Sequence, residues 1–328
     1  MRVAVLGGGA WGCALAGLLA DRGAVVVLWE FDARAAARLA ETRQSPHLGA
    51  RLPDAVRVTA DLAEAATGPD LVVVATPSDF VRATVEAAAL FFAPGAGVVC
   101  AAKGLEAGSM LTMDAVIAGA APACRVALLS GPTFAREIAA GLPAAVVVAA
   151  RDGELASFVQ RALTGGPLRV YTTDDVVGVA IGGALKNVVA IAVGVADGLG
   201  FGANARAALI TRGLSEMARL AVRMGAHPLT LAGLAGMGDL VLTCTGDLSR
   251  NRQVGLALAR GESLPEVMRR LGQVAEGVGT ARTAAALAAA HGVRMPIVSS
   301  IAAVLHEGKP PREAVAELLA RDFRAERD

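Results

Sequence analysis

The chain has 328 residues, of which 54% are hydrophobic and only 3% aromatic, so it is long enough for two domains with cores built mainly from Ala, Val, Leu and Gly. A formal net charge of +1 without a dense run of like charge gives no support to an acidic tail or to a nucleic-acid partner. The four cysteines lie far apart and the four histidines follow no metal-ligand spacing, so we expect no metal, no disulfide framework and a reducing, cytoplasmic setting.

A glycine-rich turn follows the first predicted strand, residues 3–6, and leads into a helical pattern. The run GGGAWG at residues 7–12 contains a GxGxxG motif between a strand and a helix, which is typical of dinucleotide-binding proteins. In such a turn Gly7 allows the tight bend, Gly9 lets a pyrophosphate approach the backbone, and Gly12 lets the helix lie close to the strand. The cofactor's pyrophosphate would lie at the N-terminus of this helix.

A second predicted strand, residues 24–29, ends at Glu30, where an acidic side chain would bind the adenosine ribose 2′-hydroxyl. Glu30 and Asp32 would repel a 2′-phosphate, which favours NAD over NADP. Arg34 lies close enough in sequence to favour the phosphate, so the residues leave both dinucleotides open. Solvation of Glu30 and Asp32, as charges at a strand end and a helix cap, is the alternative interpretation.

Later apolar segments alternate with helical ones, which predicts a doubly wound, Rossmann-like parallel sheet with an antiparallel edge late in the domain. Ligands of such sheets bind at the carboxyl ends of the strands. Lys103 stands at one of these ends and would point into the cleft; the alternative is a surface lysine after a strand. The segments concerned are 70–75, 97–102, 125–129, 144–150 and 168–171.

From residue 176 onward the pattern is helical, so we predict an α/β domain over residues 1–175 and an all-α domain over residues 176–328. Asp174 or Asp175 is expected to cap the first long helix. Asn204 is expected to cap the next helix after a loop, and residues 236–245 are expected to form a polar-ended loop.

Lys186 lies inside an apolar run from residue 176 to residue 196. An ammonium group is costly to bury there unless it is paired or neutralised. The chain has only three lysines among its 31 basic residues, so a lysine in this run indicates a task that arginine cannot perform, namely giving up a proton. A transmembrane helix is the alternative, but Lys186 would then sit near the middle of the membrane, so we expect a buried core helix and no stable membrane insertion.

Ser249, Arg250 and Asn251 stand together at the predicted start of a later helix. Backbone N–H groups, a guanidinium group and two hydrogen-bonding side chains in one place are suited to binding an anion. An N-cap followed by solvated arginines is the alternative interpretation.

Six stretches in this order make the chain resemble the NAD(P)-dependent glycerol-3-phosphate dehydrogenases of the bacterial type, from Arg2 to about Ala320. They are GGGAWGCALA, AAKGLE, SGPTFAREIAAGLP, GVAIGGALKNVVAIAVGVADGLGFGANARAALITRGLSEM, GMGDLVLTCTGDLSRNRQVG and GQVAEG.

The resemblance implies the roles of individual residues. Lys186 would be the proton acceptor, with Lys103 and Asp239 beside it as further catalytic residues. The implied substrate-binding residues are Lys103, Gly131, Thr133, Lys186, Asp239, Ser249, Arg250 and Asn251. The implied cofactor-binding residues are Gly7, Gly9, Ala10, Trp11, Gly12, Glu30, Phe31, Phe80, Lys103, Ala135, Arg250, Val274 and Glu276.

The resemblance also implies a reaction and a setting. The protein would interconvert sn-glycerol 3-phosphate and dihydroxyacetone phosphate with NAD or NADP, supply glycerol 3-phosphate for phospholipid synthesis, and form a homodimer. Two alternatives stay open at this point. One is a two-domain reductase of another small keto or hydroxy acid, and the other is a non-catalytic dinucleotide sensor in which Lys186 is structural.

Overall fold

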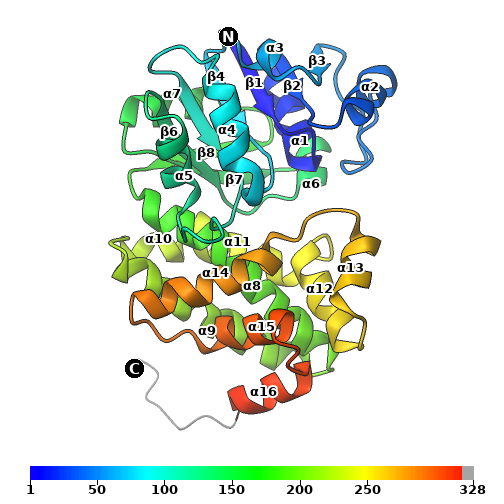
Figure 1. Ribbon diagram of the computed structural model, residues 1–328, viewed down its shortest axis with the longest axis vertical. Coiled ribbons are helices and arrows are strands. Elements are labelled where there is room, and N and C mark those ends of the chain that lie inside the picture. The colour runs from blue at the N-terminus through cyan, green and yellow to red at the C-terminus, as the bar shows by residue number, and fades with distance from the viewer. Residues whose placement is uncertain (320–328) are drawn as a thin grey trace.

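The computed structural model describes residues 1–319 and places a helix-flanked sheet above a cluster of helices (Figure 1). The last strand of the sheet, β8 (Leu168–Thr173), is followed at once by the long helix α8 (Val176–Gly198). The architecture is therefore the predicted one, an α/β half followed by an all-α half. Division into domains at residue 175 stays a prediction, and residues 320–328 of the predicted second domain lie outside the described residues.

Within residues 1–319 the strands form one eight-stranded sheet in the order β3-β2-β1-β4-β5-β6-β7-β8. Strands β1 to β6 run parallel, β7 pairs antiparallel with β6, and β8 runs parallel to β7. The doubly wound sheet and its late antiparallel pairing are thus confirmed. The other strands are β1 (Arg2–Leu6), β2 (Val25–Trp29), β3 (Val56–Thr59), β4 (Leu71–Val74), β5 (Gly97–Cys100), β6 (Arg125–Ser130) and β7 (Ala144–Ala149).

Helices cover both faces of the sheet, so its central strands are apolar on both sides; β4, for example, is buried along its whole length. One face packs against α1 (Ala10–Ala20), α6 (Ala135–Ala139) and α7 (Gly153–Leu163). The opposite face packs against α3 (Leu62–Ala66), α4 (Val81–Ala89) and α5 (Met113–Ala120), while α2 (Ala33–Thr42) lies beside β3 at the sheet edge.

Helix α8 is the centre of the second half, and nearly all of its residues up to Ala196 are buried. It is long and apolar enough to cross a membrane, but 89% of its most apolar window is buried inside the protein, as expected of a core helix. Around it lie α9 (Gly202–Arg223), α10 (Pro228–Ala232), the π-helical turn η2 (Leu234–Gly238), α11 (Asp239–Thr245), α12 (Arg250–Ala259), α13 (Leu264–Leu271), α14 (Glu276–Ala290), α15 (Pro296–His306) and α16 (Pro311–Leu319).

Asp175 is the N-cap residue of α8. One carboxylate oxygen accepts a hydrogen bond from the backbone N–H of Gly178 at 2.8 Å, and the other accepts from the N–H of His227 at 2.9 Å. Of the two aspartates expected to cap this helix, Asp175 is the one that does so, and it also ties the start of α8 to the start of α10.

Two local predictions are wrong. Residues 236–245 are not a loop but belong to η2 and α11, and their first glycine serves close packing: a Cβ on Gly236 would lie 2.0 Å from the carbonyl oxygen of Leu231 in α10. Asn204 does not cap α9, which begins at Gly202 without a side-chain cap. Gly200 and Gly202 both have positive φ, so the chain turns into the helix before it reaches Asn204.

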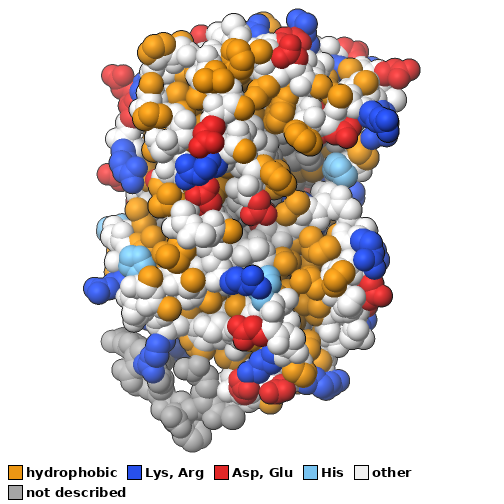
Figure 2. All heavy atoms as spheres, in the orientation of Figure 1, with side chains coloured by type: hydrophobic (Ala, Val, Ile, Leu, Met, Phe, Trp, Pro, Cys, Tyr) orange, Lys and Arg blue, Asp and Glu red, His pale blue; other side chains and the backbone are white. Residues whose placement is uncertain are grey.

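The surface matches the near-neutral charge of the sequence. On the face drawn in Figure 2, basic and acidic side chains of the described residues are interspersed. Ion pairs such as that between Arg260 and Glu262 also lie near the surface.

Candidate active site

The turn between β1 and α1 is shaped by its glycines. A Cβ on Gly7, whose φ is +119°, would lie 2.9 Å from backbone atoms of Ala75 and Thr76, and a Cβ on Gly12 would lie 1.8 Å from the carbonyl oxygen of Gly7. Gly9 precedes the first residue of α1, Ala10, and a Cβ there would meet no atom within 4 Å. The N-terminus of α1 therefore opens onto free space where backbone N–H groups can receive an anion.

Glu30 follows β2 and lies against this turn. A Cβ on Gly8 would lie 2.4 Å from Oε2 of Glu30, so the carboxylate covers the second glycine. Asp32 is used differently, because its side chain accepts a hydrogen bond from the backbone N–H of Ala35 at 2.7 Å and caps α2. Of the two acidic residues singled out in the sequence, only Glu30 faces the glycine turn.

These residues fit a dinucleotide. Gly9 faces open space, and two polar atoms of neighbouring segments, Trp11 Nε1 in α1 and Thr76 Oγ1 after β4, are buried and have no hydrogen-bond partner within residues 1–319. Large apolar side chains at three of the predicted cofactor positions are exposed: Phe31, Phe80 and Val274, with 83%, 57% and 36% of their surface accessible. Phe80 ends the short helix η1 (Ser78–Phe80) that follows β4, and Val274 lies just before α14.

Two lysines share one buried carboxylate where the two halves meet. The Nζ atom of Lys103, which follows β5, lies 2.7 Å from Oδ2 of Asp239, and Nζ of Lys186 in α8 lies 2.7 Å from Oδ1 of the same residue. The side chain of Asp239, the first residue of α11, is 1% exposed, and those of Lys103 and Lys186 are 13% and 8% exposed. The lysine predicted to be functional is thus buried and turned toward the junction of the halves.

The surroundings of Lys186 favour its neutral form. Burial lowers the pKa of its amine to about 8; the Asp239 carboxylate opposes this shift, and the Lys103 ammonium reinforces it. For Asp239, burial alone would raise the pKa, but the two ammonium groups hold it below the usual value. The cluster therefore combines an ionised carboxylate with an amine that can exchange a proton near neutral pH.

Two residues to which the sequence analysis gave no role complete this cluster. The Lys186 amine donates to Oγ1 of Thr243 at 2.9 Å, and the amide of Asn187 donates to the carbonyl oxygen of Lys103 at 3.1 Å. Thr243 stands one helical turn after Asp239 on the same face of α11, a spacing that was hidden because this stretch was predicted to be a loop.

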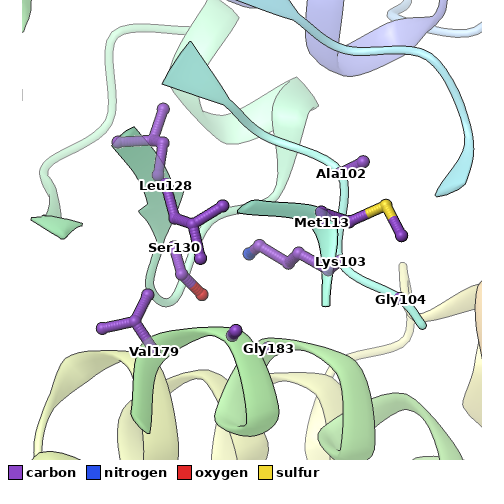
Figure 3. Close-up of a pocket in the computed structure, with 10 residues that line it drawn as sticks. Ala102, Lys103, Gly104, Met113, Leu128, Ser130, Val179 and Gly183 are labelled. Carbon is purple, nitrogen blue, oxygen red and sulfur yellow. The ribbon is translucent and has the colours of Figure 1, made fainter. Parts of the chain in front are cut away.

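A small cavity lies beside Lys103, between the carboxyl ends of the strands and α8 (Figure 3). Figure 3 shows the Lys103 side chain extending over Gly183, with the Ser130 hydroxyl on the same side. A Cβ on Gly183 would lie 3.2 Å from Oγ of Ser130, so the glycine keeps α8 close to the strand ends. The volume of this cavity is about 10 Å³, which is too little for an organic substrate.

The predicted anion cluster is at the start of α12, but its three side chains differ. Ser249 accepts a hydrogen bond from the N–H of Arg252 at 3.2 Å and so caps the helix. Asn251 is buried; its amide nitrogen donates to Oδ1 of Asn187 at 2.8 Å, and its oxygen accepts from the N–H of Gly277 at 3.0 Å. The Arg250 side chain is exposed and donates to the carbonyl oxygen of Val274 at 2.7 Å.

The remaining predicted residues line the same edge of the sheet. The carbonyl oxygen of Gly131, just after β6, accepts from the Lys103 amine at 3.1 Å and from the Thr133 hydroxyl at 3.2 Å, and Ala135 begins α6. Glu276, the first residue of α14, accepts from the N–H of Ser78 at 3.2 Å, and burial raises its pKa.

The structure thus brings part of the predicted set into direct contact. Lys103, Lys186, Asp239 and Gly131 form one cluster, which is joined to Asn251 through Asn187. The glycine turn and Glu30 form a second region at the carboxyl ends of β1 and β2.

A doubly wound sheet with a glycine turn at its switch point, together with a proton-exchanging amine at the same edge, defines a dinucleotide-dependent oxidoreductase. The model of the NAD-dependent glycerol-3-phosphate dehydrogenase N-terminus matches residues 2–156, and that of the C-terminus matches residues 175–316. The chain belongs to the family of NAD(P)-dependent glycerol-3-phosphate dehydrogenases.

Individual relatives are similar over their whole length. The chain is 51% identical to the glycerol-3-phosphate dehydrogenase of Geobacter sulfurreducens over 331 residues, with 99% of each chain covered. It is also 51% identical to that of Anaeromyxobacter dehalogenans, with 99% of this chain and 100% of the relative covered. The crystal structure of glycerol-3-phosphate dehydrogenase from Coxiella burnetii superposes with a TM-score of 0.93 at 38% identity, covering 98% of this chain and 99% of that one.

Replacing the shared carboxylate tests the energetics of the cluster. The Asp239→Asn variant leaves ammonium groups without a counter-charge in a buried site, so we expect it to lower the free energy of unfolding by roughly 3–5 kcal/mol at pH 6. Because Lys186 loses its charge as the pH rises through about 8, the loss should be smaller at pH 9. Urea denaturation of both proteins at the two pH values measures this difference; a loss of equal size at both would contradict the pairing.

Proposed function

We propose that this enzyme interconverts sn-glycerol 3-phosphate and dihydroxyacetone phosphate, with NAD or NADP as the hydride carrier. The observation that carries the proposal is the Lys103–Asp239–Lys186 cluster at the carboxyl edge of a dinucleotide-binding sheet. A secondary alcohol can be oxidised only if its hydroxyl proton leaves as the hydride does, and Lys186 offers a base whose pKa burial has lowered to about 8.

In this mechanism Lys186 accepts the proton of the C2 hydroxyl during oxidation, and its ammonium form returns a proton to the ketone oxygen during reduction. Hydrogen bonds to Asp239 and Thr243 orient two N–H bonds of the Lys186 amine, so the amine is positioned before the substrate binds. The Lys103 ammonium keeps the pKa of Lys186 low and stabilises negative charge on the substrate oxygen.

Asp239 is a positioning and charge-balancing residue in this scheme. Each of its carboxylate oxygens lies 2.7 Å from the Nζ atom of one lysine. Because the carboxylate is buried, water cannot replace either contact. The hydroxyl of Thr243 donates to the carbonyl oxygen of Asp239 at 2.6 Å while it accepts from Lys186, which joins the helix backbone to the reacting amine.

The phosphate of the substrate is assigned to the start of α12. Arg250 supplies an exposed guanidinium group, and the first backbone N–H groups of the helix supply further donors. Ser249 and Asn251 support this role through their own hydrogen bonds within the protein.

The dinucleotide would be held by the glycine turn, Glu30 and the exposed apolar side chains of Phe31 and Phe80. When bound, its nicotinamide ring accepts or donates the hydride. The carboxylate of Glu30 against Gly8 supports NAD as the preferred form, because it would repel the additional phosphate of NADP.

The setting of the enzyme is proposed along with its reaction. We infer a cytoplasmic homodimer that supplies glycerol 3-phosphate for phospholipid synthesis. The free cysteines of the described residues agree with a reducing compartment.

Steady-state assays with dihydroxyacetone phosphate and NADH test the proposed reaction directly. Turnover supports it, while activity only with a keto acid would favour a different two-domain reductase. Binding of the dinucleotide without turnover of any such substrate would favour a sensor.

Substituting Lys186 tests its role as the base. We expect Lys186→Met to lose about 100- to 10,000-fold in kcat while dinucleotide binding and folding are retained, because general acid–base catalysis contributes on that scale. Lys186→Arg keeps the charge but cannot release a proton, so it should be similarly inactive. An active arginine variant would show that charge alone is required.

The pH dependence follows from the lowered pKa of Lys186. The oxidation of glycerol 3-phosphate needs the neutral amine, so its kcat/KM should rise with pH and level off above about 8. The reduction of dihydroxyacetone phosphate needs the ammonium form, so its kcat/KM should fall above the same pH. Initial rates measured in both directions from pH 6 to about pH 10 check this, and parallel profiles would exclude a single amine as the cause.

Cofactor preference tests Glu30. We expect a higher kcat/KM with NADH than with NADPH, and expect Glu30→Ser to raise kcat/KM with NADPH by about five- to tenfold through loss of one like charge. Asp32→Asn is the matched control, because Asp32 caps α2 and should not affect the preference. A wild-type enzyme that prefers NADPH would show that Glu30 does not have the proposed role.

A further inference from the structure

Asp197 near the end of α8 is a buried carboxylate that the proposed mechanism does not use. Its side chain is 5% exposed and accepts hydrogen bonds from two arginines. Arg206 of α9 donates from Nε to Oδ1 at 2.9 Å, and Arg252 of α12 donates from Nε and Nη2 to Oδ2 at 3.0 and 2.8 Å. One carboxylate thus joins three helices.

Arg252 directly follows the residues assigned to the substrate phosphate. Each of three successive residues is fixed to a different place: Arg250 to the carbonyl of Val274, Asn251 to Asn187, and Arg252 to Asp197. Two of these anchors, Asn187 and Asp197, are on α8, the helix that carries Lys186. The first turn of α12 is therefore held to the catalytic helix at two points.

The backbones of α8 and α12 also touch. A Cβ on Gly194 would lie 2.2 Å from the carbonyl oxygen of Arg252, and a Cβ on Gly255 would lie 2.1 Å from that of Ile191. The glycines allow this close approach, and apolar side chains of both helices, such as Val254 and Val195, pack in the same core beside it. Apolar packing has no preferred direction. The ion pair between Arg252 and Asp197 supplies a directional contact at the end of α12 that faces the substrate.

Arg252 does not itself act as a phosphate ligand here. Its side chain is 12% exposed, and its guanidinium group is occupied by Asp197 and by Asp247, whose Oδ1 lies 3.0 Å from Nη1. Arg250, by contrast, is exposed. The buried arginine at position 252 and the exposed arginine at position 250 thus have separate tasks.

We propose that Asp197 is a positioning residue that acts through Arg252 to hold the first turn of α12, and with it Arg250, in register with Lys186 for binding the substrate's phosphate group. This inference rests on the proposed function. It implies that breaking the contact weakens binding of the phosphorylated substrate while the chemistry at Lys186 and the dinucleotide site stays intact.

Arg252→Lys and Asp197→Asn test the proposal. Lysine keeps the charge but not the planar fork of donors, and asparagine keeps the shape but not the charge. For both we expect the KM for dihydroxyacetone phosphate to rise roughly tenfold, with kcat within about twofold and the KM for NADH unchanged. Calorimetric titration with inorganic phosphate should show a similarly weakened Kd without any need for turnover.

Two control variants come from the same helices. Arg206→Gln breaks the other contact of the same carboxylate, and Arg260→Gln removes an exposed partner of Glu262 at the far end of α12. Neither should change the KM for dihydroxyacetone phosphate by more than about twofold. Thermal unfolding of every variant separates loss of fold from loss of binding; if Asp197→Asn does not fold, Arg252→Lys alone decides.

Three outcomes would overturn the inference. The first is an unchanged KM for dihydroxyacetone phosphate in Arg252→Lys. The second is a rise in the KM for NADH in that variant as large as the rise for dihydroxyacetone phosphate. The third is an effect of Arg206→Gln as large as that of Arg252→Lys, which would assign the positioning role to the contact with α9. If the wild-type enzyme does not turn over dihydroxyacetone phosphate, the proposed function fails. The phosphate titration then still decides whether Asp197 positions an anion site.

Discussion

A single carboxylate, Asp239, balances two lysines that come from the two halves of the chain. An ammonium group alone in the apolar interior of α8 would be strongly unfavourable, and Asp239 offsets that penalty for Lys186. With Lys103 on its other oxygen the cluster carries more positive than negative charge, so the most buried amine is the one that yields its proton. One arrangement therefore provides both a base and an attraction for an anionic substrate.

The sequence was sufficient for the main architecture because its signals are local. A strand, a glycine turn and a helix at the N-terminus, and a helix-long apolar run around Lys186, are each contained in a few successive residues. The edge strand β3 was not found, since only its first residue is buried and it lacks an apolar run. Residues 236–245 were mistaken for a loop because glycines that serve close helix packing look like turn glycines when only the sequence is known.

The candidate site was predictable in its residue types but not in its contacts. The rarity of lysine in the chain singled out Lys186, whereas its contact with Thr243 spans 57 positions and depends on how α11 packs on α8. Ser249 and Asn251 are predicted to bind an anion, and the structure adds what the sequence could not show, that both also form hydrogen bonds within the protein. A sequence shows which hydrogen-bond donors and acceptors a side chain carries. Only the folded structure shows which groups they form hydrogen bonds with.

The glycine content of α8 has a consequence for how the enzyme folds. Its five glycines, at 178, 182, 183, 194 and 198, each make an isolated helix about 1 kcal/mol less favourable than alanine would. This segment therefore has little tendency to be helical on its own and gains order only when the strand ends, η2 and α12 close around it. A nascent or damaged chain lacks the assembled cluster, so the reactive amine arises only as the final packing of both halves is reached.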